Sequence, residues 1–363
     1  MTSQLSFEVR QNPQARSASE RERVLEAPGF GQTFTDHMVS IDYTEGQGWH
    51  DARLEPYGPL VLDPATSVFH YAQELFEGLK AYRQANGSIV AFRPYANAAR
   101  FNASAARMAM PELPEDTFVE SLELLVQTDR EWVPTTEGHS LYLRPFMIAT
   151  QAGLGVNYPS KSYRYMVIAS PAASYFTGGV QPVSVWLSTE YTRAAPGGTG
   201  FAKCGGNYAA AFVAQRQAVA EGCDQVVWLD AVEHRYVEEM GGMNLFFVFG
   251  DRLFTPALTG TLLPGITRDS ILTFAGDLGL TVEEGRISIE EWQAGCESGE
   301  LTEVFACGTA AVVTPVGSVK GADRSWTVGD GTPGPVTLRI REELMGIQYG
   351  SRPDPRNWVH KIA

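Results

Sequence analysis

Positive charge and long apolar runs are scarce in this sequence, and each scarcity excludes a class of protein. Only 28 Lys and Arg residues face 42 Asp and Glu residues, which gives a formal net charge of −14 without a basic cluster. Nucleic-acid binding depends on Lys and Arg that neutralise phosphates, so the expected partners are small molecules. No run of about 18 apolar residues occurs, and the N-terminus is too polar for the apolar core of a signal peptide. We therefore expect no membrane span and a cytoplasmic protein.

Cysteine is also scarce, and the few cysteines lie far apart. No CxxC is present, and no histidine stands near a cysteine at a metal-ligating spacing. We therefore predict neither a disulfide framework nor a metal site, and we assign no catalytic role to the scattered histidines. The pattern favours reduced thiols in a reducing compartment. The cysteines are Cys204, Cys223, Cys296 and Cys307.

The length of 363 residues indicates about two domains, since a domain has roughly 150 residues. With 44% hydrophobic and 19% charged residues, the chain can bury a sizeable core. Residues 1–30 are polar, and we expect them to form an N-terminal arm with little core of its own. Two adjacent glycines and a nearby proline favour an interdomain loop at 174–183. We expect a small α+β domain at 31–173 and a large α+β domain at 184–363.

Local patterns predict helices and strands in both halves. Alternating residues at 88–92 predict a strand, and Pro94 stands where the first turn of the following helix would begin. Asp116 is expected to cap a second helix, and Ser288 with Glu291 predicts a capping box. Short connections in the second half indicate antiparallel strands. The other expected elements are strands within 140–150, 163–172, 183–194, 225–239 and 243–256, and helices at 207–222, 265–280 and 336–350.

The segment PGGTGFAKCGG contains the most informative residue, Lys203, which is its only cation. Apolar surroundings disfavour the charged ammonium form, and a neutral amine can form a Schiff base with a carbonyl cofactor. A P-loop is excluded because Ala202 precedes the lysine and Cys204 follows it. A dinucleotide fingerprint is excluded because Lys203 stands where the third glycine belongs. Taken alone, the segment fits an ordinary surface lysine equally well.

Two glycine-flanked turns and one carboxylate favour the catalytic interpretation of Lys203. LLPGITRDS places backbone N–H groups at a helix start, and ACGTAAVVTP places others after a strand, where each turn can bind a phosphate or carboxylate. Glu239, which precedes two glycines, can pair with a protonated ring nitrogen. Each turn alone is more often only a turn. Together with Lys203, they indicate a phosphorylated carbonyl cofactor, pyridoxal 5'-phosphate.

Six segments in this order resemble the branched-chain amino acid aminotransferases, which are pyridoxal-phosphate enzymes of fold type IV with two α+β domains. The resemblance extends from about Phe30 to the C-terminal helix, and two of the segments are most similar to bacterial, actinobacterial-type members. It implies that Lys203 is the Schiff-base lysine and carries the proton between the substrate Cα and the cofactor C4′. It also implies that Glu239 binds the pyridine nitrogen and that Tyr208 binds the phenolic oxygen. The segments are HYAQELFEGLKAYR, SLYLRPF, GGTGFAKCGGNYAAAF, EEMGGMN, LLPGITRDS and CGTAAVVTP.

The same resemblance implies a phosphate site and a substrate pocket. The backbone at Thr309 and Ala310 is expected to hold the substrate α-carboxylate. Ala311 and Thr314 stand where some animal members have a redox CxxC, so that kind of thiol switch is not expected. Without the resemblance, an arginine on a helix would be read as solvated and most of the aromatic residues as core. The implied phosphate ligands are Arg100, Ile266, Thr267 and Thr309, and the implied pocket residues are Phe34, Tyr71, Phe76, Tyr142, Arg144 and Tyr175.

The resemblance implies a homodimer that exchanges amino groups between L-leucine, L-isoleucine or L-valine and 2-oxoglutarate by a ping-pong reaction. A wall of Tyr and Phe side chains suits the apolar substrates. Arg144 and the Tyr142 hydroxyl can pair with the second carboxylate of 2-oxoglutarate. The alternatives within the fold are a D-amino-acid transaminase and an aminodeoxychorismate lyase. A protein that binds pyridoxal phosphate without turnover is an alternative of another class.

Overall fold

The computed structural model describes residues 5–174 and 179–363, which form two compact units. Within these residues, the first unit contains the chain up to Ser174 together with Ala202–Gly205 and Ile347–Ala363, and the second contains the remainder. The change of unit after Ser174 falls at the start of the expected loop 174–183, of which residues 175–178 lie outside the described part.

The division differs from the expected one at two segments, which we had placed in the large domain. The C-terminal segment belongs to the first unit because its strand Val359–Lys361 pairs with Ile89–Phe92. The segment Ala202–Gly205 belongs there because the Lys203 carbonyl accepts a hydrogen bond from the Phe76 N–H, at 2.9 Å. Both are long-range pairings that leave no local trace in the sequence.

The first unit is built on a nine-stranded sheet in the order β1-β3-β2-β8-β7-β5-β6-β18, with β4 paired to β7. All neighbours are antiparallel except β1 and β3. The strands are β1 (Glu8–Val9), β2 (His37–Thr44), β3 (Gly48–Pro56), β4 (Glu74–Phe76), β5 (Leu79–Arg83), β6 (Ile89–Phe92), β7 (Ser140–Ala149), β8 (Ser162–Ala172) and β18 (Val359–Lys361). The helices are α1 (Ala18–Glu26), α2 (Ser67–Tyr71), α3 (Pro94–Arg107), α4 (Glu115–Thr128) and the 3-10 turn η1 (Arg130–Trp132).

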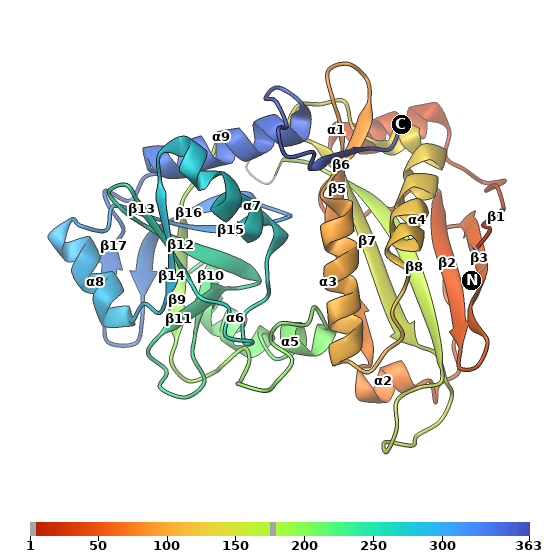
Figure 1. Cartoon of the computed structure of the whole chain (residues 1–363), viewed down its shortest axis with the longest axis horizontal. Coiled ribbons are helices and arrows are strands. Elements are labelled where there is room, and N and C mark those ends of the chain that lie inside the picture. Colours follow the sequence, from red (N-terminus) through yellow and green to blue (C-terminus); the bar gives the residue numbers. More distant parts are fainter. Residues whose placement is uncertain (1–4, 175–178) are drawn as a thin grey trace. The chain divides into compact units, whose positions relative to one another are not determined.

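The two faces of this sheet differ in burial. Helices α3 and α4 pack against each other and cover one face (Figure 1). The β7 residues Leu141, Leu143 and Met147 belong to the core beneath these helices. Their alternating neighbours in β7, which include Tyr142 and Arg144, are only half-buried and lie on the opposite face. The expected strand within 140–150 is therefore confirmed, with one face in the core and one half-buried.

The N-terminal arm, expected to have little core of its own, contains strand β1 and helix α1. Strand β1 pairs with β3, and α1 carries a capping box between Ser17 and Glu20 but has no buried residue. The Asn12 N–H donates to His37 Nε2, at 2.9 Å, and His37 Nδ1 lies 2.7 Å from Asp129 Oδ1. The arm has no core of its own and is attached to the first unit by strand pairing, by polar contacts and by partly buried apolar residues that pack against the core of that unit. These residues are Leu5, Phe7, Val24 and Leu25.

The second unit is also built on a nine-stranded sheet. The order is β11-β10-β9-β16-β15-β12-β13-β14, and a further β11–β12 pairing closes six of these strands into a ring. The strands are β9 (Val183–Ser188), β10 (Gln225–Leu229), β11 (Val237–Met240), β12 (Met243–Phe249), β13 (Arg252–Pro256), β14 (Thr281–Gly285), β15 (Glu303–Gly308), β16 (Val312–Lys320) and β17 (Ser325–Thr327), which pairs with β16. The helices are α5 (Gly205–Ala209), α6 (Phe212–Ala220), α7 (Ile266–Phe274), the 3-10 turn η2 (Ala275–Leu278), α8 (Ile289–Ser298) and α9 (Pro335–Tyr349), of which α5 and α9 each cross from one unit to the other.

Several local predictions are confirmed, and two are wrong in detail. Pro94 opens α3, and the capping box of Ser288 and Glu291 is present at α8. Asp116 does not cap α4, which begins one residue earlier with Pro114 at the cap position. The Ala-rich segment forms two helices, because the N–H of Ala211 bonds three residues back to the Tyr208 carbonyl. None of the helices in the described part of the chain has the length and apolarity needed to cross a membrane.

Candidate active site

The backbone of Lys203 is held on both sides within the first unit. Its N–H donates to the hydroxyl of Ser104, a buried residue of α3, at 3.0 Å. Its carbonyl accepts the Phe76 N–H, at 2.9 Å, and the Gly205 N–H donates to the Glu74 carboxylate. The Lys203 Nζ lies 5.0 Å from the centre of the Phe76 ring. The amine is therefore carried by a backbone that packing and hydrogen bonds fix in place.

Arg100, the expected phosphate ligand, is a buried cation that pairs with a buried carboxylate. Its Nε and Nη2 donate to the two oxygens of Glu77, at 2.7 and 2.9 Å, and the Asn97 amide adds a 2.7 Å bond. Burial raises the pKa of Glu77, but the positive charges of Arg100 and Lys203 outweigh it and hold that pKa below its ordinary value. The pair fixes the Arg100 guanidinium on the helix that also contacts the Lys203 backbone.

The half-buried face of β7 brings three expected pocket residues together. Arg144 Nη2 donates to the Tyr142 hydroxyl at 3.1 Å, and the guanidinium carbon lies 4.7 Å from the centre of the Phe76 ring and 5.4 Å from that of Tyr142. The Arg144 Nε is buried and has no hydrogen-bond partner among the described residues. A buried donor of this kind is suited to an anionic ligand. Glu74 lies close enough for the Arg144 charge to influence it, and burial raises its pKa.

The segment before β2 contains two phenylalanines, Phe30 and Phe34. Of these, Phe30 contacts Tyr142, whereas Phe34 does not lie against the residues around Arg144. The Phe30 and Tyr142 rings are 5.0 Å apart in an edge-to-face arrangement, whereas Phe34 stacks on Tyr57, also at 5.0 Å. Sequence reasoning missed Phe30, although its place between Gly29 and Gly31 was a usable signal. Tyr175, the remaining expected pocket residue, lies outside the described residues.

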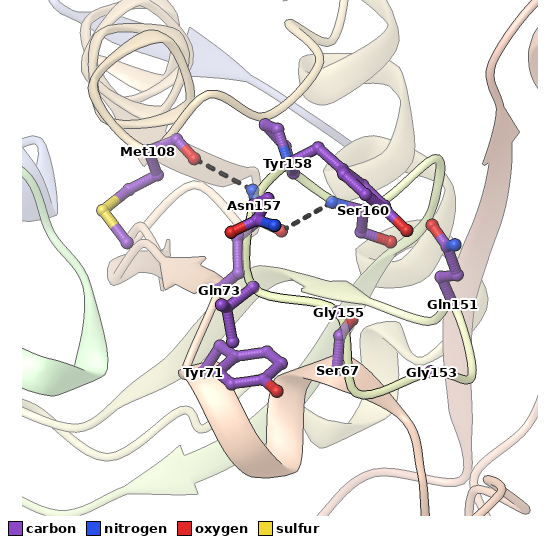
Figure 2. A pocket seen from close by; sticks show the side chains of 12 residues that line it. Ser67, Tyr71, Gln73, Met108, Gln151, Gly153, Gly155, Asn157, Tyr158 and Ser160 are labelled. Carbon is purple, nitrogen blue, oxygen red and sulfur yellow. Dashed lines mark hydrogen bonds between the residues drawn. The ribbon is translucent and has the colours of Figure 1, made fainter.

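Tyr71 lies in a separate cavity of the first unit, with a volume of about 400 Å³ (Figure 2). Its hydroxyl donates to the Leu154 carbonyl at 2.6 Å. The Gln73 amide in the wall bonds to the Met108 carbonyl at 3.0 Å and to the Ser160 N–H at 3.1 Å, as the dashed lines in Figure 2 show. Tyr71 is the one expected site residue among those that line this cavity.

In the second unit, the pairing of the strands places several expected cofactor residues near Glu239. Glu239 of β11 pairs with Asn244 of β12, which pairs with Cys307 of β15. Cys307 belongs to β15. Thr309, two residues later, lies in the turn that joins β15 to β16. Within this ring of strands, Glu239 and the turn of Thr309 and Ala310 therefore lie at the same end. Burial raises the pKa of the Cys307 thiol far above its ordinary value, so this cysteine is not a nucleophile.

The start of α7 lies beside the same strands. Gly265 is the N-cap residue and provides no side-chain cap, so the N–H groups of Ile266 and Thr267 at the helix start have no acceptor within the helix. A Cβ at Gly265 would overlap the Asn244 side-chain oxygen. This position therefore needs glycine for a close approach, and the approach brings the helix start next to Asn244.

Two further features complete this part of the second unit. The Tyr208 ring lies beside Gly242, so that a Cβ at that glycine would be 3.5 Å from its Cε1. Val312, directly after the turn, has φ of 63°, a left-handed conformation that is strained for a β-branched residue. Strain of this kind is typical of turns whose geometry serves a ligand.

Comparison with known proteins defines the class. The family model for amino-transferase class IV matches residues 74–319. The branched-chain-amino-acid aminotransferase of Mycolicibacterium smegmatis is 60% identical over 99% of this chain and 98% of its own. The chain therefore belongs to the class IV aminotransferases, in the family of the branched-chain-amino-acid enzymes. This confirms the family and the fold class that the sequence predicted.

Solved structures agree with this result. The Escherichia coli branched-chain amino acid aminotransferase superposes with a TM-score of 0.74 at 30% identity, over 90% of this chain and 100% of its own. The branched-chain amino acid aminotransferase of T.th. with pyridoxamine 5'-phosphate gives a TM-score of 0.73 at 30% identity, over 90% of this chain and 99% of its own. A second structure of that enzyme contains N-(5'-phosphopyridoxyl)-L-glutamate.

Proposed function

We propose that this aminotransferase transfers amino groups between L-leucine, L-isoleucine or L-valine and 2-oxoglutarate in a ping-pong reaction. We further propose pyridoxal 5'-phosphate as its cofactor, a homodimer as its assembly and the cytoplasm as its location. The observation that carries the substrate proposal is Arg144, a cation close to both the Phe76 and the Tyr142 ring, with a buried N–H that has no hydrogen-bond partner among the described residues. One site can therefore accept an apolar side chain against the rings and a carboxylate on the guanidinium.

The donor set fits pyridoxal phosphate, piece by piece. Lys203 provides an amine for the carbonyl carbon, and Glu239 provides a buried carboxylate for the ring nitrogen. The α7 start and the turn after β15 provide N–H groups and hydroxyls for a phosphate. When bound, the cofactor stores the amino group between the half-reactions and withdraws electrons from the substrate Cα.

The residues of this chain would then perform distinct tasks. Lys203 holds the carbonyl carbon in the resting enzyme and afterwards moves the proton at the substrate Cα. Glu239 keeps the ring nitrogen protonated, and the Tyr208 hydroxyl binds the phenolic oxygen. The proposed phosphate ligands are Arg100, Ile266, Thr267 and Thr309. The proposed substrate ligands are Phe76, Tyr142, Arg144, Tyr175 and the backbone of Thr309 and Ala310. Phe34 and Tyr71, which lie apart from the Arg144 group in the first unit, are proposed on the resemblance alone.

The direct test mixes the purified protein and pyridoxal phosphate with 2-oxoglutarate and each L-amino acid, and measures the glutamate formed. We expect activity with leucine, isoleucine and valine. Activity only with D-amino acids, or pyruvate release from aminodeoxychorismate, would replace the proposal with one of the other activities of the fold. Cofactor binding without any turnover would point to a non-catalytic protein.

Replacing Arg144 by methionine should separate the two half-reactions. A charge-assisted hydrogen bond contributes roughly 1.5–3 kcal/mol, which corresponds to about a ten-fold to hundred-fold loss for glutamate and 2-oxoglutarate. Leucine makes no such bond, and the methionine stem retains contact with the rings, so the leucine half-reaction should change little. Single-turnover rates with leucine and with glutamate measure both effects on one variant.

The matched control is Arg164→Met, which removes another half-buried arginine of the same sheet, one that bonds to Asp42 at 2.6 Å. This control should leave the ratio of the two half-reactions unchanged. Equal losses for leucine and glutamate in Arg144→Met would show that Arg144 organises the pocket in general. An unchanged glutamate rate would show that another group receives the carboxylate.

Substituting Gly78 by alanine should disturb the contact between Arg144 and Tyr142 by steric overlap. A Cβ at Gly78 would overlap the Tyr142 hydroxyl and its ring carbon Cζ, so the ring must shift, which disturbs its bond to Arg144. Overpacking costs about 1–3 kcal/mol, and we expect a roughly ten-fold to hundred-fold loss in the glutamate half-reaction. The measurement is the single-turnover rate with glutamate.

The control for this steric effect is Gly58→Ala, where the new Cβ would meet only the Pro56 carbonyl, at 4.0 Å. If Gly78→Ala behaves like Gly58→Ala, the close approach of Gly78 to Tyr142 has no role in the pocket.

A further inference from the structure

One buried arginine of the second unit joins Glu239 to two backbone segments. The side chain of Arg193 is 6% exposed, and its Nε lies 3.1 Å from Glu239 Oε2. Its Nη1 donates to the Thr261 carbonyl at 2.8 Å, and Nη1 and Nη2 both lie 3.2 Å from the Gly200 carbonyl. The guanidinium is thus held by an ion pair with one carboxylate and by hydrogen bonds to two carbonyls.

The other oxygen of Glu239 is bound by the segment that Arg193 also holds. Glu239 Oε1 accepts the Leu263 N–H at 2.6 Å, and the Asn244 amide lies 3.4 Å away. The same Asn244 amide donates to the Leu263 carbonyl at 3.0 Å. The carboxylate is therefore oriented by Arg193 on one side and by Leu263 on the other.

The two backbone segments approach each other too closely for any side chain between them. A Cβ at Gly200 would overlap the Thr261 carbonyl, the same carbonyl that Arg193 binds. In the sequence, Gly200 stands three residues before Lys203, and Thr261 stands five residues before Ile266 at the start of α7. Arg193 thus links the segments that lead to the proposed cofactor lysine and to the proposed phosphate ligands.

The charge of Arg193 matters because Glu239 is only 1% exposed. A buried carboxylate without a cationic partner is strongly destabilising, whereas removing both charges of a buried pair costs far less. The neighbouring Glu238 differs, since it bonds to the Thr261 hydroxyl and burial raises its pKa despite that bond and the Arg193 charge. Of the two adjacent glutamates, Arg193 forms its direct ion pair with Glu239.

We infer that Arg193 is a positioning residue for the aminotransferase reaction. It keeps the Glu239 carboxylate charged and oriented toward the position of the cofactor ring nitrogen, and it fixes the segment from Thr261 to Leu263 that leads into α7. The inference rests on the proposed role of Glu239 in binding pyridoxal phosphate. It adds to that role a residue that makes no contact with the cofactor itself.

The first test needs no cofactor and uses the full chain. Arg193→Gln should lower the Tm of the apo-protein, because it leaves the Glu239 charge buried without its partner. The double variant Arg193→Gln/Glu239→Gln should regain most of that loss, since the buried charge is gone. Arg235→Gln, which removes an exposed arginine that pairs with Glu290, is the matched control and should leave Tm nearly unchanged.

The second test measures pyridoxal phosphate binding by titrating each apo-protein with the cofactor. Arg193→Gln should raise the cofactor Kd about ten-fold to a hundred-fold, the range expected when a buried charged group loses its partner. Arg193→Lys retains the charge but loses the fork, so its Kd should lie between those of the wild type and Arg193→Gln. If Arg193→Gln does not fold, Arg193→Lys and the double variant still provide both comparisons.

The third test is the leucine half-reaction across the same variants. Because much of the effect of Arg193 passes through Glu239, the loss of rate in the double variant should be smaller than the product of the two single losses. Losses that simply multiply would overturn the inference, as would an Arg193→Gln protein with wild-type Kd and rate. A wild-type protein that does not bind pyridoxal phosphate would instead refute the proposed function, while the Tm comparison would still report on the ion pair.

Discussion

Lys203→Ala is expected to abolish transamination and leave the protein folded. The substitution removes both the amine that would hold the cofactor and the group that would move the proton at the substrate Cα. The fold should persist because the contacts that fix this position are backbone contacts, to the Ser104 hydroxyl and to the Phe76 N–H, which alanine retains. The measurements are glutamate formation from leucine and 2-oxoglutarate, and the Tm.

The matched control is Lys161→Ala, which removes an exposed lysine paired with Glu45 and should retain full activity. In the wild type, borohydride reduction followed by peptide mapping should find the cofactor attached to Lys203. Attachment to another lysine would refute the assignment. Unfolding of Lys203→Ala would show that the side chain is structural.

Where local sequence determined local structure, prediction succeeded. Pro94 opens α3 because its fixed φ suits a first helical turn, and Ser288 with Glu291 forms the capping box because both partners lie within one turn. The family and the fold class could be predicted because six motifs occur in a fixed order, and the class IV match confirms both. These signals come from residues close together in the chain or from their joint occurrence.

Long-range pairing could not be predicted in the same way. The strand β18 pairs with β6 across more than half of the chain, and nothing in either segment specifies that partner. The sequence also does not predict the hydrogen bond between the Phe76 N–H and the Lys203 carbonyl. This bond holds Ala202–Gly205 in the first unit. Strand pairing depends on the whole sheet, so single-sequence patterns give strands but not neighbours.

The candidate site shows the same limit at the level of side chains. Motifs indicated Arg100, Lys203 and Glu239, but not the buried partners Glu77 and Arg193 that orient two of them. A charged residue in a polar segment resembles a solvated one until the fold buries it. The ion-pair partners of Arg100 and Glu239 are therefore known only from the tertiary structure, and the inference about Arg193 depends on one of these pairs.

Glu239→Gln should slow both half-reactions by about 10²–10³-fold, the loss typical of removing one electrostatic group that stabilises a transition state. The neutral amide cannot stabilise a protonated ring nitrogen, so the cofactor loses much of its capacity to withdraw electrons. Cofactor affinity should fall much less than the rate, because the phosphate ligands are unchanged. Glutamine has the shape of glutamate, and its oxygen can still accept the Leu263 N–H, so the local fold should be retained.

Single-turnover rates and a pyridoxal phosphate titration on the same preparation separate these effects. Glu238→Gln is the matched control, since it neutralises the adjacent glutamate, which bonds to the Thr261 hydroxyl and whose pKa burial already raises. This control should retain most of the wild-type rate. Near-normal turnover in Glu239→Gln together with a large loss in Glu238→Gln would move the pyridine partner to Glu238. Losses of rate and affinity in equal proportion would show that Glu239 binds the cofactor without assisting the chemistry.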